Sequence, residues 1–215
     1  YIVDGGGFTL GSTRGFTLTN GTIDFNNQTF SGPTSGITIS TGSSVLKNLS
    51  GGTIITHTSG NLTLGSNLTL TGNYTLTAGT LSLGTYTLTT PVFSSNNSNT
   101  RSINFGTSKI VLNGSTTSTI WNMATVTGLT VAGTPLVECI GGGTGVTKTI
   151  SPGPVTEAQA ISFSLLETTG TVTYTITSLT SNVKNLIVNG SQTLTNSNIG
   201  IYGSFTHLTT NGTTT

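Results

Sequence analysis

Few side chains in this 215-residue chain could carry out chemistry. The carboxylates, imidazoles and thiol are Asp4, Asp24, Glu138, Glu157, Glu167, His57, His207 and Cys139. Glycoside cleavage normally needs two carboxylates held about 5–10 Å apart across the bond. Asp4 and Asp24 lie 20 positions apart (24 minus 4), roughly one coil of the repeat described below. Nothing nearby completes a site, so we interpret them as isolated surface acids or turn caps.

The imidazoles and the thiol are equally isolated along the sequence. His57 and His207 stand in Thr- and Ser-rich β-type segments, where a ring that points outward or is partly packed is expected. Cys139 belongs to a short apolar run, Leu136–Ile140, which predicts a buried free thiol. A single Cys excludes a disulfide framework. No cluster of His, Cys and Asp has the spacing of metal ligands.

The sequence motifs of common enzymes are also absent. There is no Gly-x-x-x-x-Gly-Lys-Ser/Thr phosphate loop and no Gly-x-Ser-x-Gly nucleophile turn. The sequence therefore predicts a protein that is not an enzyme. It predicts no catalytic, cofactor-binding or metal-binding residue, and no cofactor.

Charge is scarce: 5% of the residues are charged and the net charge is +1. The cations are scattered and form no basic stripe for nucleic acid. They are Arg14, Lys47, Arg101, Lys109, Lys148 and Lys184. No apolar run approaches the roughly 18 residues that span a bilayer, so membrane insertion is not expected. Disorder is disfavoured because it accompanies low hydrophobicity and high net charge.

A repeating pattern of short strands, which must position all the other residues, is clearest in the stretch 61–89. Apolar residues come there as i, i+2 pairs separated by a Thr or Ser, with Gly, Asn and Ser between pairs. A period of two places both members of a pair on one face of a strand. The pairs start at positions 62, 68, 74, 81 and 86, steps of 6, 6, 7 and 5. These steps are too short for a sandwich, whose turns recur about every 8–12 residues.

We therefore predict an all-β fold, a β-solenoid (β-helix) with short strands. Three faces of about six residues give about 18–19 residues per coil, and we expect a right-handed coil. This register stacks Leu64 under Leu83, Leu68 under Tyr86 and Leu70 under Leu88. The predicted core stack is Leu62, Leu64, Leu68, Leu70, Tyr74, Leu76, Leu81, Leu83, Tyr86, Leu88, Ile103, Phe105, Ile110 and Leu112.

Two features outside this stretch carry their own predictions. The polar run Ser94–Thr100 has no inward residue and predicts a loop or a wide corner. Trp121 is expected to fill a wide part of the core; a binding platform of the kind that exposed aromatics form for sugars is the alternative.

The predicted organisation is a solenoid over residues 1–150 that continues with longer strands over residues 151–215. Lys47-Asn48-Leu49 recurs as Lys184-Asn185-Leu186, an offset of 137 (184 minus 47). The offset suggests a second copy of a module of that length. The alternative is that the two tripeptides match by chance, because the composition is biased. The chain begins without Met and ends in the middle of the pattern, so we interpret it as a fragment of a longer chain.

Several segments resemble the Thr-, Asn- and Gly-rich repetitive structural proteins of tailed bacteriophages. They are Gly79–Thr90, Phe93–Leu112, Val146–Gly153, Glu157–Phe163 and Val183–Val188. The resemblance implies a virion fibre or tail-associated adhesin, extracellular and often homotrimeric, that contacts other virion proteins. It supplies no catalytic residues.

The resulting expectation is a tail fibre-like segment that serves as spacer and host-surface attachment, with a host surface glycan or protein as possible partner. A bacterial secreted or surface adhesin or filament uses the same architecture and is the alternative. A polysaccharide depolymerase is a third hypothesis, but it needs clustered acids and exposed aromatics along a groove. The sequence lacks those acids.

Overall fold

The alternation of Thr with apolar residues is realised as short parallel strands. A computed structural model describes residues 10–11, 16–25, 30–31, 37–39, 42–49, 54–166, 171–177, 181–189, 192–196 and 199–208. In these residues nearly all regular structure is β, because Thr, Val and Ile fit a pleated, half-buried surface better than a helix.

Three parallel sheets form the body of the molecule. The nine-stranded sheet contains β2 (Phe16–Leu18), β5 (Ile37–Ile39), β7 (Ile55–His57), β10 (Tyr74–Leu76), β13 (Phe93–Ser94), β16 (Ser118–Asn122), β19 (Val146–Ser151), β21 (Val172–Ile176) and β24 (Thr193–Asn196). The six-stranded sheet contains β3 (Gly21–Asp24), β6 (Ser43–Lys47), β8 (Asn61–Leu64), β11 (Gly79–Ser82), β14 (Arg101–Asn104) and β17 (Leu129–Ala132). The seven-stranded sheet contains β9 (Leu68–Thr69), β12 (Leu88–Thr90), β15 (Ile110–Leu112), β18 (Leu136–Cys139), β20 (Ser162–Leu165), β23 (Leu186–Asn189) and β26 (Phe205–Leu208).

The remaining elements are small. They are the pair β1 (Leu10–Gly11) and β4 (Phe30–Ser31), the pair β22 (Asn182–Val183) and β25 (Gly200–Ile201), and one 3₁₀ turn, η1 (Glu157–Gln159). The turn follows β19 and packs against the end of the six-stranded sheet, where the Gln159 side-chain amide donates to the Leu129 carbonyl at 2.7 Å.

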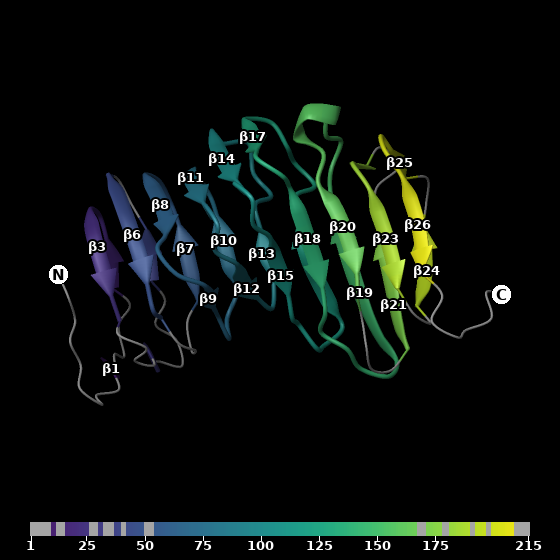
Figure 1. Cartoon of the computed structure of the whole chain (residues 1–215), viewed down its shortest axis with the longest axis horizontal. Coiled ribbons are helices and arrows are strands. Elements are labelled where there is room, and N and C mark those ends of the chain that lie inside the picture. The colour runs from purple at the N-terminus through teal and green to yellow at the C-terminus, as the bar shows by residue number, and fades with distance from the viewer. Residues whose placement is uncertain are drawn as a thin grey trace.

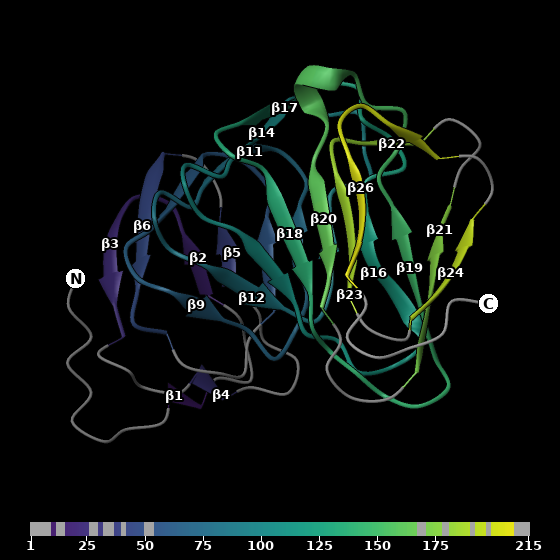
Figure 2. The same ribbon diagram turned by 45° about the vertical axis from the view of Figure 1, so that its right-hand side comes forward.

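The chain visits the three sheets in a fixed order. It passes through β7, β8 and β9, then β10, β11 and β12, and then returns to the first sheet at β13. Except at the ends of the sheets, each strand pairs in parallel with the strand one coil earlier and the strand one coil later. The predicted all-β solenoid is therefore confirmed, with about 7 turns. Figure 1 shows β12, β15, β18, β20, β23 and β26 side by side, and Figure 2 turns β16, β19, β21 and β24 into view.

The coil length changes along the solenoid. Ile55 pairs with Tyr74 and Tyr74 pairs with Phe93, so these coils hold 19 residues each, as the spacing predicted. Phe93 pairs with Trp121, 28 positions on, because two corners of this coil are longer than those of the coil before: the polar segment after Phe93 and the segment between β15 and β16. Ser94 belongs to β13, and the residues from Ser95 to Thr100 form the predicted loop. The prediction that this run has no inward residue is wrong at Ser95, which is fully buried and donates to the Leu76 carbonyl at 3.0 Å.

Thirteen of the fourteen predicted core residues are buried, each no more than 2% exposed. Tyr86 was assigned wrongly: its side chain is 37% exposed. A tight turn runs from Leu83 to Tyr86 and is closed by a 3.0 Å bond from the Tyr86 amide to the Leu83 carbonyl. Because of this turn, the next strand, β12, begins only at Leu88. Leu68 therefore pairs with Leu88, not with Tyr86.

Because β12 begins at Leu88, a second stacking prediction is also wrong. Since Thr69 pairs with Thr89, the inward neighbour of Leu70 is Thr90 and not Leu88. Thr90 is fully buried, and its hydroxyl donates to the carbonyls of Gly72 and Val92 at 3.0 Å each. The third stacking prediction is confirmed: Thr63 pairs with Ser82, which brings Leu64 next to Leu83.

The nine- and seven-stranded sheets continue across residue 150, where β19 pairs with β21 from Val146 to Ile150, whereas the six-stranded sheet ends at β17. Some positions related by the offset of 137 lie in the same sheet and others do not: Leu64 is in the six-stranded sheet, whereas Ile201 is in β25 of the separate two-stranded sheet. Ile39 and Ile176 are both in the nine-stranded sheet, and Leu68 and Phe205 are both in the seven-stranded sheet. The larger module itself stays a prediction.

Candidate binding surface

The residues considered for catalysis do not come together in the described part of the chain. Asp24 accepts a 2.9 Å bond from the Asn48 amide in the neighbouring coil, which is a structural role. Glu157 opens η1, and Glu138 makes an ion pair described below. Asp4 and Glu167 lie outside the described residues. No three His, Cys, Asp or Glu side chains among the described residues lie close enough to hold a metal ion.

The single thiol and the tryptophan belong to the core. Cys139, the single cysteine of the sequence, is fully buried, as predicted from its apolar surroundings. Trp121 is also fully buried and stacks on Phe93 with ring centroids 4.7 Å apart. Phe93 in turn stacks on Tyr74 at 5.5 Å. Trp121 therefore fills the core, and a binding platform at this position is excluded by its burial.

His57 is fully buried, so the prediction of an outward or partly packed ring is wrong at this position. Burial lowers the pKa of His57, because a charged ring would lose its hydration. His207 differs: it lies in β26, in which all four side chains are exposed.

Arg101 is a buried cation that the sequence placed only among scattered charges. Its guanidinium donates to the Ser95 hydroxyl at 2.7 Å and to the Ser95 carbonyl at 2.8 Å. It also donates to the carbonyls of Asn99, Thr125 and Thr127, at 3.0, 2.7 and 2.7 Å. Its pKa is lowered by desolvation. Arg101 thus binds the loop after β13 to the loop before β17, and its role is structural.

A groove crosses the outer side of the seven-stranded sheet. Its volume is about 630 Å³, and its lining comes from the corner before β12 through to the corner before β26. These six strands are neighbours in the sheet, so the groove runs along the solenoid axis for roughly 24 Å at about 4.8 Å per strand. Val111 and Ser164, which alternate with inward residues, are only 6% exposed beside it.

The lining of the groove is mostly hydroxyl-bearing. Seven of its thirteen residues are Ser or Thr, and three, including Leu136 and Ile187, are apolar. Lys109 and Lys184 supply two amines, and no carboxylate lines the groove. Sequence reasoning missed this surface, because its residues are separated by 19 to 27 positions and look like ordinary outward positions.

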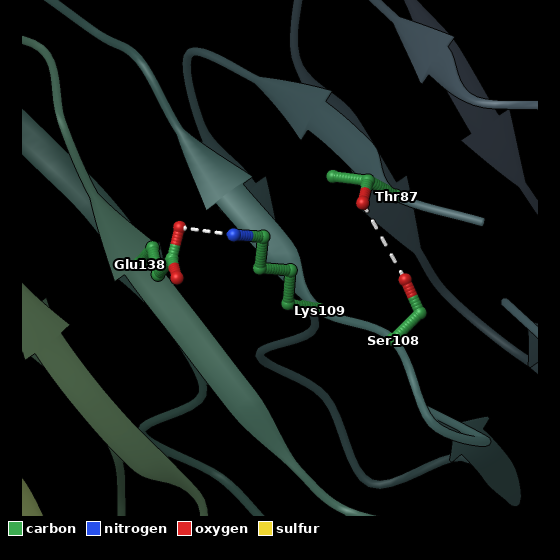
Figure 3. A network of polar contacts seen from close by, with 4 residues as sticks. All are labelled: Thr87, Ser108, Lys109 and Glu138. Atoms are coloured by element: carbon green, nitrogen blue, oxygen red, sulfur yellow. Dashed lines mark hydrogen bonds and ion pairs between the residues drawn. The ribbon is translucent and has the colours of Figure 1, made fainter. Parts of the chain in front are cut away.

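Polar contacts hold the walls of the groove in place. The Lys109 amine lies 2.7 Å from Glu138 Oε2, and the Thr87 hydroxyl lies 3.5 Å from that of Ser108 (Figure 3). At the other end the Asn185 amide donates to the Ser162 hydroxyl at 3.1 Å, and its oxygen accepts the Ser204 amide at 2.9 Å. Each bond joins two coils, so the groove is preformed.

Comparisons with protein-family models, with curated proteins and with solved structures find no match. No helix in the described residues is long and apolar enough to cross a membrane. The class of the protein therefore follows from its architecture: it is a β-solenoid repeat protein, and this fold is compatible with a structural role in a fibre or an adhesin.

Proposed function

We propose that this chain is a structural segment of a virion fibre or appendage, similar to a tail fibre, that serves as spacer and host-surface attachment. The observation that supports it most is the stacking of parallel strands, coil upon coil, around one apolar core. Because every coil pairs with both neighbours, the interior contacts repeat along one axis and produce a rod.

The outer surface supports the same role. The outward positions next to the core pairs are hydroxyls, such as Thr63, Thr69 and Ser82, none of which is buried. These groups hydrate a rod without charge. The low charge disfavours nucleic acid as a partner, and we propose a homo-oligomer, a trimer in the first instance, that contacts other virion proteins and a host surface glycan or protein.

The proposal assigns the chain no catalytic activity and no cofactor. The bacterial secreted or surface adhesin remains the alternative, because both would use the same rod.

An antibody raised against the purified chain tests the localisation. Gold-labelled antibody on thin appendages of virus particles, seen by electron microscopy, is the expected result. Label on bacterial surfaces or on free filaments instead would move the function to the adhesin. Light scattering of the purified chain at several concentrations measures its mass: three copies are expected, and a monomer throughout would contradict the trimer.

A further inference from the structure

We propose that the groove on the seven-stranded sheet binds an acidic polysaccharide whose sugars carry carboxylates, with the polymer lying along the solenoid axis. This inference rests on the proposed attachment function and names its ligand class and its site. Four observations support it, and they concern the shape, the charge, the hydroxyls and the backbone of the sheet.

The shape fits an extended polymer. The groove crosses six consecutive strands, from the corner before β12 to the corner before β26. It is longer than a single sugar, since roughly 24 Å of groove follows from about 4.8 Å per strand. The groove is also preformed by bonds between coils, so little ordering is needed on binding.

The charge fits a carboxylate. Lys109 already binds a carboxylate, Oε2 of Glu138, at 2.7 Å, and Lys109 remains partly open to solvent, at 38% side-chain exposure. Lys184 is exposed at the other end of the groove and makes no ion pair among the described residues. The two amines are separated by three strand spacings, about 14 Å. A polymer with acidic groups at intervals can reach both, and its acid would compete with Glu138 for Lys109.

The hydroxyls favour a polysaccharide over an acidic peptide. Seven Ser and Thr side chains line the groove and can exchange hydrogen bonds with sugar hydroxyls, while Leu136 and Ile187 offer apolar contact to sugar ring faces. A peptide usually binds a sheet by adding a strand at an open edge. The central strands here, such as β18 and β20, already pair on both sides, so the groove presents no backbone edge.

Calorimetric titration of the purified chain tests the proposal, with polygalacturonate as the carboxylated probe. Dextran serves as the neutral probe and polyglutamate as the peptide probe, all at about 0.15 M salt, where distant charges are screened. We expect polygalacturonate to bind at least about tenfold tighter than either of the others. Equal binding of dextran would overturn the role of the lysines, and equal binding of polyglutamate would overturn the polysaccharide class.

Two lysine variants locate the site. Lys184→Gln and Lys109→Gln should each weaken polygalacturonate binding by roughly three- to tenfold. Lys47→Gln, on β6 of the six-stranded sheet, changes the net charge equally and should leave binding unchanged. Equal losses in all three variants would show non-specific attraction and overturn the site.

A gain-of-binding variant complements the losses. Glu138→Gln removes the carboxylate that competes for Lys109 and should tighten binding by roughly threefold. Glu157→Gln in η1 changes the charge equally outside the groove and should have no effect. Ser162→Trp should block the groove without changing charge, whereas Ser102→Trp on β14 of another sheet should not. Melting curves identify any variant that fails to fold. If Ser162→Trp folds and still binds polygalacturonate as tightly as the unmodified chain, the site is wrong.

The attachment function and the groove can fail separately. If the chain binds host cells and Ser162→Trp does not reduce that binding, the groove proposal is wrong and attachment stands. If the chain binds no host cells, the attachment function fails. If it then also binds no polygalacturonate, the groove proposal fails with it.

Discussion

His57 and Tyr74 are hydrogen-bonded to each other inside the solenoid, with 3.0 Å between His57 Nδ1 and the Tyr74 hydroxyl oxygen. The other ring nitrogen, Nε2, lies 3.1 Å from the carbonyl oxygen of Gly60. A carbonyl only accepts, so Nε2 carries a proton. Burial lowers the pKa of His57 and favours the neutral ring, in which Nδ1 accepts the bond from the Tyr74 hydroxyl. The two residues join consecutive coils, since β7 pairs with β10.

Stability is expected to fall below neutral pH because of His57. Its pKa is lowered in the folded state by burial, so between its ordinary value of about 6.5 and the lower folded value only the unfolded chain takes up a proton. The contribution of His57 is complete above pH 6.5 and is lost as the pH falls below it, by at most about 1.4 kcal/mol per pH unit. Urea unfolding between pH 7.5 and 5.0 measures this slope.

The control for this prediction is the other histidine. His207→Gln should keep the slope, because His207 lies in the exposed strand β26. The double variant His57→Leu, Tyr74→Phe should flatten it without leaving an unpaired hydroxyl. An unchanged slope in the double variant would show that other groups set the pH dependence.

Replacing Arg101 should destabilise the middle of the solenoid. Arg101→Leu removes the donor to the hydroxyl and the carbonyl of Ser95, which is fully buried, and each unsatisfied buried group costs about 1–3 kcal/mol. We expect a loss of about 3 kcal/mol or more in the free energy of unfolding. Arg101→Lys should restore little, because an ammonium cannot reproduce the planar fork of donors. Ser102→Ala, at the adjacent outward position, serves as the control and should change stability by less than about 0.5 kcal/mol.

A carboxylate introduced at Leu70, in the core, should lower the free energy of unfolding far more than the same carboxylate at Tyr86, which the structure places at the surface. Leu70 is fully buried, and Leu70→Asp should destabilise the rod by several kcal/mol, roughly the cost of burying an unpaired polar or charged group. Tyr86→Asp should be tolerated, because Tyr86 is 37% exposed. Thermal unfolding followed by circular dichroism compares the two. If Tyr86→Asp lowered the melting temperature as much as Leu70→Asp, Tyr86 would be part of the core after all.

Alanine substitutions at Gly84 and Gly106 distinguish backbone strain from a collision between neighbouring coils. Gly84 and Gly106 both have positive φ, 63° and 57°, so alanine is strained at either position, by roughly 1–2 kcal/mol. A Cβ at Gly106 would also collide with the Gly84 carbonyl oxygen in the previous coil, while a Cβ at Gly84 meets nothing within 4 Å. Gly106→Ala should therefore lower the melting temperature clearly more than Gly84→Ala. Equal effects would mean that the coils can separate locally at no cost.

The sequence by itself determined the fold class and most of the core. Pairs such as Leu62/Leu64 and Leu81/Leu83 have a period of two and recur after 19 residues, and only strands stacked coil upon coil bury every pair. The apolar run around Cys139 likewise predicted its burial. These features are local or strictly periodic, so composition and spacing are enough to reveal them.

Tertiary structure decided what depends on the exact register. A turn at Leu83–Tyr86 shifts the next strand, turns Tyr86 outward and brings Leu88 next to Leu68. The shift from Tyr86 to Leu88 is two positions, which leaves a pattern of alternating polar and apolar residues unchanged, so the sequence does not reveal it. Arg101, an ordinary surface cation in the sequence, becomes buried because two loops fold over it. The groove likewise exists only because corners 19 to 27 residues apart meet on one sheet.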